Sequence, residues 1–172
     1  MSEAIVNRVS ESSLITLNLE DYYPSTDIVE FDLKDYLFMG MILKEKPFRE
    51  SLSQLDLEPF RGKVAAVTCS ADAIIPQWAY MLVASVLQPV CADVLFGNAE
   101  SVRQQLLLRN IASISASEYD GKRLVIKGCG EKPVGPDAYL LATKLLRPFA
   151  KSIMYGEPCS TVPVYKQTKP NS

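Results

Sequence analysis

The sequence predicts an α/β fold: a single domain with a mostly parallel sheet that carries helices on its faces. The first observation is that short apolar strands alternate with helical segments from Lys63 onward, which is typical of βαβ units. The second is an internal duplication, because residues 64–98 resemble residues 124–157 at a spacing of 59 positions. Each copy reads as a strand, a turn with a cysteine, a helix opened by proline and a second strand. A chain of 172 residues fits one domain, residues 1–172.

The first part of this domain, residues 1–62, is expected to be a small β/α extension that packs on the core. Two short strands are predicted, over residues 13–19 and 27–33, from alternating or β-branched apolar residues. Because only a short turn separates them, these two strands can form an antiparallel pair. The extension would then add a small unit to the main sheet.

Helices are expected to complete the extension. Asp32 can cap a helix over residues 33–44, since a carboxylate accepts hydrogen bonds from the free N–H groups of a first turn. This helix is apolar nearly all round over residues 36–43, so it is either buried or covered by a partner. A shorter helix is predicted from Pro47 to about Leu55.

The duplicated βαβ core covers residues 63–166. Its strands are predicted from continuous apolar runs, and its helices from apolar residues at helical spacing. The predicted strands are residues 64–68, 92–96, 123–127 and 152–155. The predicted helices are residues 75–87, 99–113 and 137–147. The polar tail from Val164 is expected to fray.

Composition excludes several classes of function. A net charge of −2 and a pI near 5.3 argue against a nucleic-acid binder, whose affinity comes from clustered lysines and arginines. The first twenty residues lack the apolar core of a secretory signal, and the longest apolar run, residues 36–43, is too short to span a bilayer. We therefore expect no membrane association and a cytoplasmic location, where cysteines stay reduced.

The chain contains no histidine. This excludes Ser-His-Asp and Cys-His catalytic groups within the chain, as well as every zinc site that uses histidine. Any metal would have to be held by thiolates, carboxylates and backbone groups.

The four cysteines are the main candidates for chemistry. Cys69 and Cys129 each end a predicted strand, and they coincide in the two copies if one residue is inserted between strand and helix. Cys159 follows the last strand. Because ligands bind at the carboxyl ends of parallel strands, these three thiols are expected at one edge of the sheet. Cys91 precedes a strand and is expected at the opposite edge.

Three converged thiolates suit zinc or iron, including an iron–sulfur cluster, because sulfur is a soft ligand. Asp72 or Glu157 can supply a fourth ligand. The plain alternative is that the cysteines are small buried core residues, for which strand ends are ordinary places.

Neighbouring residues provide candidates for a pocket around the thiols. Ser70 and Ser160 can hydrogen-bond to sulfur, or they can cap turns. Trp78 can wall the pocket, although a packing role is the commoner one. Gly130 belongs to a Gly-Cys-Gly turn that could cradle phosphate, but Pro133 stands where the last glycine of a dinucleotide motif is required.

Several longer motifs resemble a known family. They are CSADAIIPQWAYML at residues 69–82, IKGC at residues 126–129 and KSIMYGEPCSTVPVYK at residues 151–166. Together with residues 5–24 and 32–50, they make the chain similar to the bacterial domain-of-unknown-function family 2480 over nearly all of its length. The resemblance implies that Cys69, Cys129 and Cys159 lie in the family's thiol-bearing motifs, and it implies association with iron–sulfur assembly proteins as partners.

Three functional hypotheses follow from the sequence. The first is a metal or iron–sulfur site formed by the three cysteines, for metal or cluster handling. The second is a non-catalytic interaction module, in which the apolar residues 36–43 dock a partner or a second copy, as in a homo-oligomer. The third is a metal-free thiol enzyme with Cys69 or Cys129 as its nucleophile.

Overall fold

A computed structural model describes residues 14–157 and 160–169 of the chain, without the side chains of Glu157 and Ser160. It confirms the α/β class and the predominance of parallel strands, but the strands form two sheets instead of one. By its contacts the chain divides into unit 1, residues 1–24 and 106–172, and unit 2, residues 25–105. The single-domain organisation stays a prediction, and each unit is described by itself.

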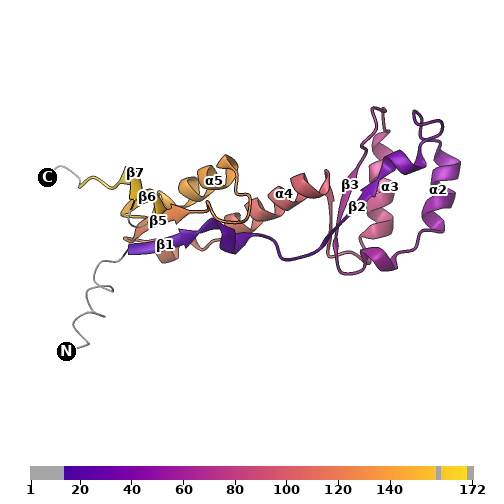
Figure 1. Cartoon of the computed structure of the whole chain (residues 1–172). Helices are drawn as coiled ribbons and strands as arrows, with labels where there is room; N and C mark the ends of the chain where they lie inside the picture. Colours follow the sequence, from indigo (N-terminus) through magenta and orange to yellow (C-terminus); the bar gives the residue numbers. More distant parts are fainter. Residues whose placement is uncertain (1–13, 158–159, 170–172) are drawn as a thin grey trace. The chain divides into compact units, whose positions relative to one another are not determined.

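Unit 2 contains a three-stranded parallel sheet with two helices on one of its faces (Figure 1). The strands lie in the order β2-β3-β4, and their side chains from one face join those of both helices in a single core. Phe48 and Val83, one from each helix, are fully or almost fully buried there. The elements are β2 (Ile28–Asp32), α2 (Glu45–Ser53), β3 (Val64–Thr68), α3 (Gln77–Leu87) and β4 (Asp93–Phe96).

Unit 1 has a four-stranded sheet in the order β1-β5-β6-β7, in which only β7 is antiparallel to its neighbour. Leu107 and Ile111 of the second half of α4, with Leu146 of α5, join Leu17 and Leu124 of the sheet in one core. The elements are β1 (Leu14–Asn18), the part of α4 (Ala99–Ala112) from Leu106 onward, β5 (Arg123–Lys127), α5 (Pro136–Leu146), β6 (Ser152–Glu157) and β7 (Ser160–Lys166).

The predicted duplication is confirmed by matching backbone detail in the two units. Gly62 and Gly121 have φ of 71° and 70°, in the left-handed region that favours glycine. The N–H of Gly62 donates to Val90 O at 2.9 Å, and the N–H of Gly121 donates to Phe149 O at 3.0 Å. The two copies therefore enter their strands through the same turn.

The N-terminal strands do not form the antiparallel pair that the sequence predicts. β1 pairs with β5 and β2 pairs with β3, both in parallel. The pairing extends the sheet of each unit by one strand, which covers apolar side chains that an isolated two-stranded ribbon would leave in water. The extension thus contributes one strand to each sheet.

The helix predicted over residues 33–44 is also wrong. Asp32 caps a single 3₁₀ turn, η2 (Leu33–Tyr36), by accepting from the N–H of Lys34 at 2.9 Å. The chain then forms a tight turn in which Phe38 bridges Ile42 and Gly40 has a φ of 71°. Glycine favours this turn and disfavours a helix interior.

This turn exposes apolar side chains that were expected on a helix either buried or covered by a partner. Four side chains are 47–75% exposed; they are Phe38, Met39, Met41 and Ile42. We call these four residues the apolar loop. Tyr36, by contrast, stacks on Phe31 with ring centroids 5.1 Å apart and belongs to the core of unit 2.

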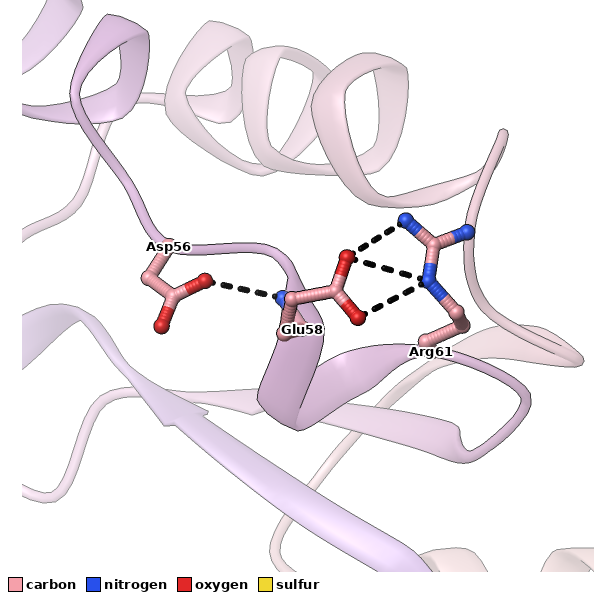
Figure 2. Close-up of polar contacts among 3 residues, drawn as sticks. All are labelled: Asp56, Glu58 and Arg61. Carbon is pink, nitrogen blue, oxygen red and sulfur yellow. Dashed lines mark hydrogen bonds and ion pairs between the residues drawn. The ribbon is translucent and has the colours of Figure 1, made fainter.

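A short polar network shapes the turn that leads into β3 (Figure 2). Asp56 accepts from the N–H of Glu58 at 3.1 Å, and Arg61 donates to the Glu58 carboxylate at 2.8 Å. The hydrogen bonds and positive charge of Arg61 hold the pKa of Glu58 below its ordinary value. The network closes the 3₁₀ turn η3 (Glu58–Phe60), which places Phe60 in the core.

The end of the chain is more ordered than its polarity suggests. The chain was expected to fray from Val164, but residues 164–166 belong to β7, which pairs with β6. The N–H of Gln167 also donates to Lys151 O at 2.8 Å. None of the helices in the described part of the chain is long and apolar enough to cross a membrane.

Candidate functional site

The cysteines end strands of two different sheets. Cys69 follows β3 in unit 2, and Cys129 follows β5 in unit 1. The expectation that the thiols share one edge assumed a single sheet. Because β3 and β5 belong to two different sheets, Cys69 and Cys129 do not end strands of the same sheet. Cys159 lies outside the described residues. Cys91 precedes β4, so within unit 2 it is at the edge opposite Cys69, as predicted.

The two copies also align differently from the sequence-based alignment around their cysteines. The same number of residues separates β3 from α3 and β5 from α5, so no residue is inserted. In the register of the structure, Cys129 corresponds to Ser70 and Cys69 corresponds to Gly128. Each unit therefore has one thiol at this turn, at adjacent positions.

Cys129 lies against two tyrosine hydroxyls. Its Sγ is 3.0 Å from the hydroxyl of Tyr155 on β6 and 3.5 Å from that of Tyr139 on α5. The two rings meet edge to face with centroids 5.6 Å apart. Cys129 is exposed, so a reagent or substrate can reach the sulfur. The geometry joins an accessible thiol to two hydroxyl groups that can donate hydrogen bonds to it.

Both hydroxyls keep their protons over the physiological pH range. Burial, together with the hydrogen bond to Cys129, raises the pKa of Tyr139. The hydrogen bond and the charge of Cys129 raise the pKa of Tyr155. When Cys129 is a thiolate it has no proton to donate, so both tyrosines are then donors to sulfur. Hydrogen bonds to a charged form favour that form.

A small depression of about 90 Å³ lies beside the thiol, with Glu20 and Lys127 among its lining residues. Asn18 at the end of β1 accepts from the N–H of Glu20 at 3.1 Å and so begins the 3₁₀ turn η1 (Leu19–Tyr22). Gly130 also lines the depression, and a Cβ there would collide with the Glu20 carboxylate. Glycine at this position therefore leaves room for a carboxylate next to the thiol.

Unit 2 has a different polar arrangement at the same place. Ser70 replaces the thiol, and both its N–H and its hydroxyl donate to the Asp32 carboxylate. Tyr80 and Phe96 stand where unit 1 has Tyr139 and Tyr155, with the same edge-to-face contact at 5.6 Å. The aromatic pair is thus shared by both units, whereas the contact of a thiol with two hydroxyls is not.

The remaining predicted site residues are not among the described residues that line the depression beside Cys129. Trp78 is half-buried in the core of unit 2, with its ring centroid 6.3 Å from that of Phe48. Asp72 is exposed in the turn after Cys69. Glu157 and Ser160 face each other across the β6–β7 pair as backbone partners, and their side chains are outside the description.

The metal hypothesis gains no support from this arrangement. Among the residues that the structure describes, no group of three or more cysteine, aspartate or glutamate side chains is close enough to hold an ion. Cys69 makes a local contact instead, because its Sγ lies 3.7 Å from Ala71 O. Zinc, iron and iron–sulfur binding stay predictions from the sequence.

Sequence reasoning singled out Cys129 and Gly130 but missed the residues around them. Asn18 ends β1 and Glu20 lies in the turn η1 that follows it, in a segment that was assigned to a separate extension. Tyr155 was missed although the spacing of 59 positions already places it opposite Phe96. The inserted residue paired Cys129 with Cys69, which hid that Cys129 corresponds to Ser70.

Comparison with known proteins gives a family and no relative of known function. A family model described as "Protein of unknown function (DUF2480)" matches residues 3–167. No match was found among the curated proteins or among the solved structures.

Proposed function

Because the chain belongs to the DUF2480 family, whose description assigns no activity, we propose a function from the site itself: Cys129 is a nucleophile toward small disulfide substrates. The observation that carries this proposal is the contact of an exposed thiol with two tyrosine hydroxyls, at 3.0 and 3.5 Å. The nucleophile in such chemistry is the thiolate, which hydrogen-bond donors favour.

The second unit supports a chemical role for this contact. Its aromatic pair has the same geometry with Ser70 in place of Cys129 and Phe96 in place of Tyr155. The fold therefore does not require a sulfur and a second hydroxyl at these positions. Their presence together in unit 1 favours a function over a packing requirement.

The proposed reaction is thiol–disulfide exchange. The Cys129 thiolate attacks one sulfur of the substrate, the substrate S–S bond breaks, and the second sulfur leaves as a thiolate that takes a proton from water. Cys129 is left in a mixed disulfide, which a free thiol from solution resolves by the same exchange. Lys127 lines the depression and provides positive charge near the departing thiolate.

Alkylation of each cysteine, followed by peptide mass spectrometry, tests the reactivity of Cys129. At neutral pH we expect Cys129 to react with iodoacetamide at least about tenfold faster than Cys91, because burial raises the pKa of the Cys91 thiol and lowers its thiolate fraction. The Cys91 rate should approach that of Cys129 only as the pH rises. Equal rates at neutral pH would contradict the proposal.

The variant Tyr155→Phe tests the hydroxyl contact. It should slow alkylation of Cys129 at neutral pH by about three- to tenfold and move the rise of the rate to higher pH, because the thiolate loses a donor. Tyr80→Phe in unit 2 is the matched control and should leave the rate unchanged. A thiol–disulfide exchange assay with a small aromatic disulfide tests the reaction itself. In this assay, Cys129→Ala should remove the fast phase of exchange, whereas Cys69→Ala should retain it. Metal content that fell in parallel with Cys129→Ala would favour the metal hypothesis instead.

A second candidate function is self-association through the apolar loop. The favouring observation is the exposure of four large apolar side chains on one turn, Met39 most of all at 75%. Methionine side chains adapt readily to a facing surface, and the same loop from two copies can form a self-complementary contact.

Light scattering over a range of concentrations tests this second candidate. The wild-type chain should form dimers, and Met39→Glu/Met41→Glu should be monomeric because charges would be buried in the contact. Met81→Glu is the control, since Met81 is 71% exposed on α3 and outside the loop. A wild-type chain that is monomeric at every concentration would rule the candidate out.

A further inference from the structure

A basic groove lies at the amino end of the sheet of unit 1, away from Cys129. It consists of two depressions, of about 330 and 650 Å³, that share Lys151 and Lys166 as lining residues. Arg123 lines the smaller one and Lys169 the larger one. We call these four residues the basic groove.

The groove is built by the backbone of unit 1. β6 and β7 pair in antiparallel register with Ser152 opposite Lys166. The N–H of Lys151 donates to Lys122 O at 2.8 Å, and the N–H of Gln167 donates to Lys151 O at the same distance. These hydrogen bonds bring the starts of β5 and β6 next to the end of β7, so that cations distant in the sequence converge.

The described residues that line the groove include cations but no carboxylates. No acidic residue is among the described residues that line either depression. The ion pairs of Arg49 with Glu45 and of Arg61 with Glu58 belong to unit 2 and not to the groove. The guanidinium of Arg147 lies 4.6 Å from the ring centroid of the lining residue Tyr165. Among the described lining residues, an anion in the groove would therefore meet cations and no carboxylate.

The smaller depression also offers an apolar wall. Met154, Pro163 and Tyr165 line it together with Arg123 and the two shared lysines. Both volumes lie within the range of about 300–1,000 Å³ that is usual for small-molecule sites. The combination suits a ligand with an anionic end and a flat apolar part.

We propose that the basic groove binds a small polyphosphate ligand of the nucleoside di- or triphosphate class. Lys151, Lys166 and Lys169 provide point charges for the phosphates, and the guanidinium of Arg123 can donate two parallel hydrogen bonds to one of them. The ring of the ligand lies on the apolar wall. A macromolecular polyanion is less favoured, because the net charge of the chain is −2, which opposes binding over a wide surface.

This site is distinct from the thiol site. Arg123 begins β5 and Lys127 ends it, immediately before Gly128 and Cys129. A strand of this length spans about 13 Å at roughly 3.3 Å per residue, so the groove and the thiol lie at opposite ends of one strand. The inference does not depend on the proposed reaction of Cys129.

Calorimetric titration of the full chain with sodium tripolyphosphate, ATP and adenosine tests the proposal. ATP and tripolyphosphate should bind, more weakly as salt is added, and adenosine alone should bind much more weakly. The double variant Lys151→Gln/Lys166→Gln should lose at least about tenfold in affinity for both anions. The control Lys34→Gln/Lys46→Gln, which removes two exposed lysines of unit 2, should bind as the wild type does.

Two further measurements separate loss of the site from loss of the fold and from other ligands. Amide hydrogen exchange in β5 and β6 of the groove variant should match that of the wild type, which reports that unit 1 is folded. The proposal is overturned if tripolyphosphate binds neither protein, or binds the wild type and the groove variant equally. It is also overturned if a single-stranded oligonucleotide binds far more tightly than ATP, since the groove would then serve nucleic acid.

Discussion

Shortening Leu146 to alanine is expected to destabilise unit 1 by about 2–5 kcal/mol, because it leaves a cavity in a closely packed core. Leu146 is fully buried in the cluster that joins α4, α5 and the sheet of unit 1. Every buried residue of that cluster belongs to unit 1. Amide hydrogen exchange should therefore show faster exchange in β5 and β6, and denaturant unfolding should give the size of the loss.

The matched control is Leu87→Ala. Leu87 occupies the same place in unit 2 and is also fully buried, but it belongs to the separate core of that unit. The same substitution there should accelerate exchange in β3 and β4 instead. If either variant accelerated amide exchange equally in both sheets, the two cores would unfold as one cooperative unit. The division of the chain into unit 1 and unit 2 would then be wrong.

Replacing Gly97 by alanine should cost about 1–3 kcal/mol, because residues with a side chain strongly avoid its backbone conformation. Its φ is 131°, and a Cβ would collide with the hydroxyl of Ser101. The N–H of Gly97 donates to Val67 O at 2.9 Å, which joins the end of β4 to β3. A thermal or denaturant unfolding measurement on unit 2 checks the loss.

Gly121→Ala separates backbone strain from collision. Gly121 has a φ of 70°, and no described atom lies within 4 Å of the place its Cβ would take. Only the left-handed backbone then opposes the substitution, at a cost of about 1–2 kcal/mol. A Gly97→Ala loss no larger than the Gly121→Ala loss would mean that Ser101 moves aside freely.

The duplication supplies an internal comparison for the candidate site. Two copies of one strand–turn–helix–strand unit keep the same aromatic contact and the same buried leucine, yet they differ in the groups at the carboxyl end of the strand. Unit 2 has a serine that donates to the Asp32 carboxylate. Burial raises the pKa of Asp32, but the hydrogen bonds from Ser70 and Lys34, with the charge of Lys34, more than offset this effect and lower that pKa. Unit 1 has a thiol between two hydroxyls. The difference between the copies lies at the residues on which the proposed function of Cys129 depends.

Part of the candidate site could be predicted from the sequence. A cysteine directly after a buried strand and a glycine beside it are visible as a local pattern, and both lie at the depression of unit 1. Glu20 and Tyr155 could not be found in this way, because the turn after β1 and the strand β6 meet β5 only through sheet pairing. Their position depends on which strands are neighbours, and local periodicity carries no information about that.

The sequence by itself determined the elements of the core, since apolar periodicity decides where a segment can bury one face. The predicted strands over residues 64–68 and 123–127 coincide with β3 and β5, and the helices agree with α3, α4 and α5 to within two residues. The tertiary structure alone decided that β1 pairs with β5, more than a hundred positions away, while β2 pairs with β3. That choice divides the strands between two sheets and places Cys69 and Cys129 in different units. The physical reason is that these apolar strands show similar local patterns, so the local sequence does not distinguish their pairing partners. Only the packing of complete sheet faces does so.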